Sequence, residues 1–86
     1  MNVFQRVFSN WPGGLPHRGV VVTTLNEQIP FSDFRAGDDA VYLVRTTPDA
    51  IGGRSVILPW ESIAALKFVD EVRSKVCAEL GFEKEK

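Results

Sequence analysis

Bulky apolar residues at the amino end of the chain recur at the spacing of a helix. Their side chains fall on one face of an amphipathic helix over residues 1–11, and they are Val3, Phe4, Val7, Phe8 and Trp11. The prolines and glycines between residues 12 and 16 end this helix. Two roles are open for it: it caps the open end of the domain, or it presents a self-association surface. Docking on a membrane is disfavoured, because Arg6 is the only cation there to meet anionic lipid.

Runs of β-branched and aromatic residues between turn residues predict five short strands after residue 18. Their bounds are 19–24, 29–34, 40–46, 54–58 and 63–69. Pro30 restricts the second strand to an edge or a bend of a sheet, and Ser32 and Asp33 predict a β-bulge in it. The Pro-Trp-Glu-Ser segment at residues 59–62 predicts a one-turn hinge between the fourth and fifth strands.

Helical spacing returns after the fifth strand. Asp70 is a suitable N-cap, Gly81 is suited to end a helix, and three apolar residues between them share a face: Val72, Val76 and Leu80. We therefore expect a helix over 70–80 and a charged tail over 81–86. At 86 residues, the chain has room for a single domain, 1–86, in which residues 19–69 form the body.

Five short strands with close turns and no long helix between them indicate a mainly β protein with a small five-stranded antiparallel barrel rather than a βαβ fold. The alternation of apolar and polar residues is incomplete, because Val21, Tyr42 and Val44 add apolar side chains to both faces of their strands. Either the two terminal helices cover the extra apolar residues, or another chain pairs along an edge or covers a face of the sheet. The thin core of so short a chain favours oligomerisation or partner binding.

Composition excludes several classes of protein. A hydrophobic fraction of 44% is typical of a globular domain rather than a disordered segment. The net charge of -1 provides no global field to attract nucleic acid or an acidic membrane. The single cysteine, Cys77, excludes an intramolecular disulfide and is expected to be a buried helical residue in a reducing compartment. With no basic leader and no apolar run approaching about 18 residues, we expect a cytoplasmic protein.

The residue types that carry chemistry are too few or too scattered for an active site. His17 is the only histidine and lies in a glycine- and proline-rich connector, so it is expected to face solvent and to form no zinc set or nucleophile pair with Cys77. Asp38 and Asp39 lack the further oxygen ligands of a calcium loop and suit a turn. We therefore expect no catalytic, cofactor-binding or metal-binding residues, and no enzyme.

The order of these elements resembles the Sm-like branch of the small SH3-like barrels over residues 19–69. The segment from Phe31 to Leu43 is similar to the family's first motif, and the segment from Leu58 to Ile63 is similar to the turn that enters its fifth strand. The resemblance implies a bent five-stranded barrel, rings in which the fourth and fifth strands of neighbouring subunits pair, and binding of uridine-rich or adenine-rich RNA at the loops.

The family's RNA-binding residues do not carry over to this chain. Arg35 and Asp39 stand where the family has an aspartate and an asparagine. Pro59, Trp60 and Glu61 occupy the place of its Arg-Gly or Lys-His pair. Carboxylates near the loops also oppose a phosphate-binding pore.

Two functions follow as hypotheses. The first is a non-enzymatic protein-interaction or assembly module that self-associates as a homo-oligomer, with partner contacts through Phe4, Phe8, Trp11 and Trp60. The alternative is a divergent Sm-like RNA-binding protein that uses Arg35, Arg54 and Trp60. Three interpretations remain open for Trp60: a packing anchor, a contact for a partner protein, or a platform for a base.

Overall fold

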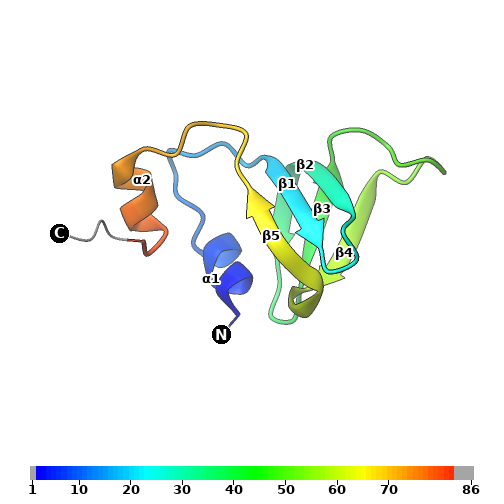
Figure 1. Cartoon of the computed structure of the whole chain (residues 1–86), viewed down its shortest axis with the longest axis horizontal. Helices are drawn as coiled ribbons and strands as arrows, with labels where there is room; N and C mark the ends of the chain where they lie inside the picture. Colours follow the sequence, from blue (N-terminus) through cyan, green and yellow to red (C-terminus); the bar gives the residue numbers. More distant parts are fainter. Residues whose placement is uncertain (1, 83–86) are drawn as a thin grey trace.

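The computed structural model describes residues 2–82 and contains one five-stranded antiparallel sheet with a helix before it and a helix after it (Figure 1). The mainly β fold class is confirmed. The elements in chain order are α1 (Val3–Ser9), β1 (Gly19–Thr23), β2 (Gln28–Ala36), β3 (Ala40–Arg45), β4 (Ser55–Pro59), the 3₁₀ turn η1 (Trp60–Ser62), β5 (Ile63–Lys67) and α2 (Ser74–Glu79).

The sheet order is β4-β3-β2-β1-β5, so β4 and β5 are its two edges although only η1 separates them in sequence. A flat sheet would hold two edges four strand spacings, or about 19 Å, apart. The four residue steps from Pro59 to Ile63 span at most about 14 Å even when fully extended. The sheet must therefore curl strongly. No β4–β5 pairing occurs among the described residues, so the sheet is open and the closed barrel expected from the sequence is not confirmed.

The long strand β2 joins the two halves of the curled sheet. Its first half pairs with β1 and its second half with β3, and the register shifts between Phe31 and Asp33, where the bulge was predicted. Pro30 lies in this central strand, not in an edge strand. Pro30 stands opposite Val20 of β1, and because the Thr23 N–H donates to the Glu27 carbonyl, antiparallel alternation directs the backbone groups of Pro30 away from β1. Its missing N–H therefore costs no hydrogen bond to β1, and on the β3 side its carbonyl accepts from the Thr46 N–H at 3.0 Å.

The core lies on the concave side of the curled sheet and is rich in aromatic rings. Its buried members are Phe8, Val21, Ile29, Phe31, Val41, Leu43, Trp60 and Ile63. Helix α1 begins at the Asn2 side chain, which accepts a hydrogen bond from the Phe4 N–H at 2.7 Å. The helix inserts Phe8 among the sheet's rings, 4.8 Å from Phe34 and 5.7 Å from Trp60 between centroids. Of the two roles open for α1, the structure shows the cap of the core.

The carboxyl-terminal helix is shorter than predicted. It runs from Ser74 to Glu79, and β5 ends at Lys67. The prediction that Asp70 is the N-cap is wrong, because Arg73 occupies the N-cap position. The Asp70 carboxylate instead accepts two hydrogen bonds from the Arg18 guanidinium, at 2.7 and 2.9 Å. This ion pair ties the connector before β1 to the segment after β5.

The predicted stop of this helix at Gly81 is confirmed. Gly81 has a φ of +97°, and the Phe82 N–H donates to the Cys77 carbonyl at 3.0 Å, as in a Schellman motif. Cys77 itself is only partly buried. Of the predicted charged tail, residues 83–86 lie outside the described part of the chain.

Candidate protein-interaction surface

Trp60 is a packing anchor. Its side chain is 2% exposed, its indole N–H donates to the Gly37 carbonyl at 3.1 Å, and its backbone N–H donates to the Asp39 carbonyl at 3.3 Å. These bonds hold the hinge against the β2–β3 turn. In the folded chain the ring is therefore accessible neither to a partner protein nor to a base, and the packing interpretation is the one that the structure supports.

The four aromatic residues predicted to contact a partner do not form one surface. Phe8, like Trp60, is 2% exposed and belongs to the core. Trp11 is half-buried, and its indole N–H is shared between the carbonyls of Leu15 and Pro16 at 3.1 and 3.3 Å. Phe4 is also half-buried and lines a cavity between the two helices. Burial removes Phe8 and Trp60 from the side chains that a partner could reach.

The residues of the alternative RNA site are also dispersed. Arg35 is exposed in β2 opposite Tyr42, whereas Arg54 precedes β4 and its carbonyl accepts from the Arg45 N–H at 2.8 Å. The β3 neighbours of these two arginines, Tyr42 and Arg45, stand three positions apart, so the backbones of Arg35 and Arg54 are offset by about 10 Å along the strand direction. With Trp60 buried, no stacking platform lies between the two arginines.

The structure exposes the free edge of β4, for which the sequence predicted pairing with a neighbour only through the resemblance and without named contact residues. The Arg45 N–H donates to the Arg54 carbonyl, so by antiparallel alternation the N–H and C=O groups of Ser55 and Ile57 point away from β3. Val56 and Leu58 face the core yet are only partly buried. The edge therefore offers both backbone groups and apolar side chains.

An exposed apolar pair continues this edge onto the outer face of the sheet. Ile57 is 67% exposed and Tyr42, directly opposite it on β3, is 39% exposed. Arg35 is the next residue in the same row. Single exposed apolar residues are ordinary, but a neighbouring pair beside a bare strand edge is typical of an interaction surface. We call Tyr42, Ser55 and Ile57 the β4 edge surface.

The second free edge belongs to β5, at the other end of the sheet. The Thr23 N–H donates to the Glu27 carbonyl, so by alternation the N–H and C=O groups of Val21 also point towards β2. Leu66 is the β5 partner of Val21, and its N–H and C=O groups therefore point away from β1, towards the free edge. Leu66 is half-buried. Charged and proline residues blunt strand edges, and here they stand only at the strand ends, as Lys67 and Pro59.

His17 and the acidic residue near it, Asp33, are exposed side chains in the described part of the chain. The His17 Nδ1 lies 3.9 Å from the Asp33 Oδ1, and both side chains are more than half exposed. No group of three or more histidine, cysteine or acidic residues in this range could hold a metal ion. Backbone N–H donors from Gly53 and Ile51 lower the pKa of Asp49, because they stabilise the charged carboxylate in the loop before β4.

Comparisons with protein-family models, curated proteins and solved structures found no match to this chain. Within the described residues, none of the helices has the length and apolar character needed to cross a membrane.

Proposed function

We propose that this chain is a non-enzymatic assembly module that associates with copies of itself through the free edges of β4 and β5. The observation that carries the proposal is the pair of five-residue edge strands, one of which presents the exposed Ile57. A strand added to such an edge gains main-chain hydrogen bonds, and the alternate side chains supply specificity. Bare edges with apolar neighbours rarely stay unpaired in natural proteins.

The hinge between the two edge strands supports an assembly in which each subunit pairs with two neighbours, one at each edge. Trp60 fixes η1 to the β2–β3 turn through two hydrogen bonds, which holds the end of β4 and the start of β5 in a set geometry. A contact of the β4 edge on one subunit with the β5 edge on the next uses two different surfaces. Such head-to-tail contacts generate closed rings when the rotation permits closure and filaments when it does not. The resemblance to Sm-like proteins implies the same arrangement.

The absolute mass in solution tests this proposal. We expect the wild-type chain to exceed its monomer mass of 9.6 kDa at micromolar concentration, and I57K to reduce the mass towards that of the monomer, since the substitution places a charge on the β4 edge surface. The matched control is I51K, because Ile51 is 94% exposed but lies in the loop before β4. A monomeric wild-type chain, or equal masses for the two variants, would refute assembly through this edge.

The same measurement repeated with single-stranded RNA addresses the alternative. The burial of Trp60 takes away the stacking residue on which RNA binding relied. We therefore expect no RNA in the assembled particle at physiological salt. RNA that co-migrates with the protein and dissociates steeply as salt rises would favour the alternative instead.

A further inference from the structure

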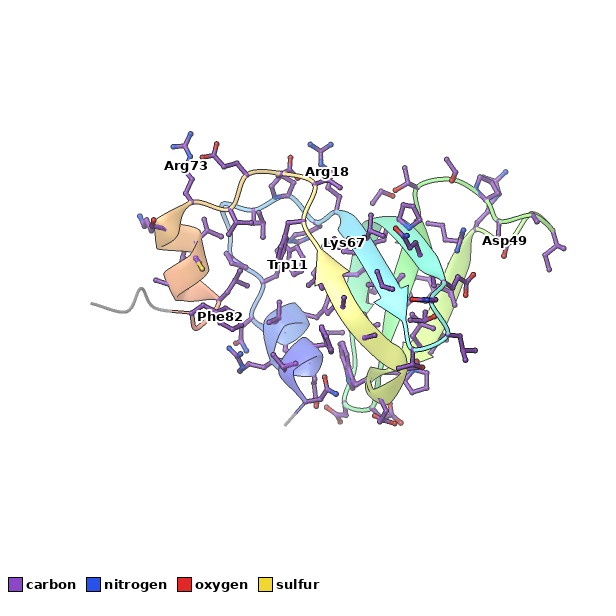
Figure 2. The ribbon with its side chains drawn as sticks, viewed as in Figure 1. Trp11, Arg18, Asp49, Lys67, Arg73 and Phe82 are labelled. Carbon is purple, nitrogen blue, oxygen red and sulfur yellow. The ribbon has the colours of Figure 1, made fainter. Side chains whose placement is uncertain are left out.

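An apolar cavity of about 190 Å³ lies where α1, the end of β5 and α2 meet. Helix α1 contributes the first lining residues, the strand and its extension the next, and the end of α2 the last: Val3, Phe4, Val7, Leu66, Phe68, Leu80 and Phe82. Figure 2 shows Phe82 at the carboxyl end of α2, on the side that faces α1. For comparison, an engineered apolar cavity of about 150 Å³ holds benzene. The space therefore suits a short hydrocarbon group.

A guanidinium group adjoins this cavity. The Arg6 Nη1 donates to the Leu80 carbonyl at 2.7 Å, and the Arg6 guanidinium lies 5.4 Å from the centroid of the Phe82 ring. Both contacted residues line the cavity. A guanidinium has five donor hydrogens, and only one has a partner in residues 2–82. No carboxylate in that range lies within ion-pair distance of Arg6. Positive charge therefore stands beside an apolar space.

The third wall of the cavity is weakly attached. Helix α2 has no buried residue between Ser74 and Glu79 and no side-chain hydrogen bond at its N-cap. Leu80, which is 5% exposed, and the contacts from Arg6 hold its carboxyl end. Segments with few buried contacts open locally at low free-energy cost. A ligand can thus enter by a small displacement of α2 without unfolding the sheet.

We propose that this cavity binds a small amphipathic anion, a carboxylate with an unbranched apolar tail. The tail lies among the side chains of Phe4, Leu66 and Phe82, and the carboxylate accepts hydrogen bonds from Arg6. The charge of Arg6 selects this occupant over an uncharged hydrocarbon or a purely apolar protein surface, because a guanidinium pairs with a carboxylate through charge-assisted hydrogen bonds. The proposal goes beyond assembly and does not depend on it, since binding is measured separately from mass.

Titration of the ¹⁵N-labelled full chain with octanoate and with 1-octanol tests the proposal, because the two probes share a tail and differ in charge. We expect amide shifts at the residues that line the cavity, with octanoate bound on the order of tenfold more tightly than 1-octanol. R6Q should remove the preference for octanoate over 1-octanol, and the ratio of the two affinities is the readout because loosening of α2 would weaken both probes alike. R73Q is the matched control, because Arg73 is exposed at the other end of α2.

A second variant separates binding from folding. V3W adds bulk at the half-exposed rim of the cavity and should weaken both probes, whereas L25W places the same ring in the exposed β1–β2 turn and should weaken neither. Equal affinity of the wild type for the two probes, shifts that scatter over the surface, or an equal loss of octanoate in R6Q and R73Q would overturn the proposal. A tenfold preference for octanoate that persists in R6Q would overturn the carboxylate contact with Arg6.

Discussion

Replacing Trp60 is expected to destabilise the fold itself. The side chain is 98% buried and contacts Phe8 within the aromatic core, so W60A removes a large aromatic group and leaves a cavity, at a cost of about 3–5 kcal/mol. A chain of this size has a total unfolding free energy of roughly 4–13 kcal/mol. W60A therefore removes a large part of the margin. W60F keeps a ring but leaves the Gly37 carbonyl without its indole donor, which we expect to cost about 1–3 kcal/mol.

Urea unfolding at one fixed chain concentration measures these costs, with far-UV circular dichroism and the fluorescence of the remaining Trp11 as two probes. L25A is the control, because Leu25 is 90% exposed and its removal should change the unfolding free energy by no more than about 0.5 kcal/mol. If W60A unfolds within about 1 kcal/mol of the wild type but loses mass in solution, Trp60 is a partner contact and the packing argument fails.

Three further substitutions have definite expectations. G19A should lower the unfolding free energy by about 1–3 kcal/mol, because an added Cβ would stand 2.6 Å from the Lys67 carbonyl oxygen. G13A is the control and should leave the unfolding free energy unchanged, since the space around Gly13 is open. Equal costs for the two variants would contradict the register of β1 and β5. G81A should speed amide hydrogen exchange in α2 and cost about 1 kcal/mol, since only glycine adopts a φ of +97° without strain; unchanged exchange would argue against the Schellman stop. The Arg18 guanidinium lowers the pKa of Asp70, so this carboxylate stabilises the fold fully above its ordinary value of 3.8 and loses its contribution as pH falls through the lower folded value. Unfolding curves at pH 6 and pH 2.5 should therefore differ less for D70N than for the wild type, and an identical difference would show that the ion pair does not form in solution.

Features that depend on nearby residues were predictable from the sequence. The bulge at Ser32 and Asp33, the hinge at Trp60 and the helix stop at Gly81 all occur where the pattern indicated. Each is decided within a few residues, by a break in alternation, by a proline before a turn or by a residue free to adopt positive φ. The order and approximate bounds of the strands follow from the same local signals.

Features that depend on distant partners were not predictable. Asp70 has the chemistry of an N-cap, but Arg18 competes for its carboxylate, and nothing near either residue indicates that the two segments meet. Pro30 is tolerated in a central strand because it stands opposite Val20 in a pair whose backbone groups do not bond to each other, which is a matter of register. The burial of Phe8 and Trp60 likewise depends on how far the sheet curls, and spacing alone cannot separate a core aromatic from an exposed one.

The position of β5 also determines when it joins the fold. The pairs of β1 with β2, β2 with β3 and β3 with β4 all connect strands that follow one another in the chain, whereas β1 and β5 pair through Val21 and Leu66, about 45 residues apart. Closing a loop of that length costs roughly 3 kcal/mol of chain entropy before any contact compensates. We therefore expect the three hairpins to form before β5 docks, and β5 to detach first during unfolding. Destabilising substitutions in β5 should chiefly raise the unfolding rate, because β5 pairs after the folding transition state. The contacts of β5 therefore set the lifetime of the native state.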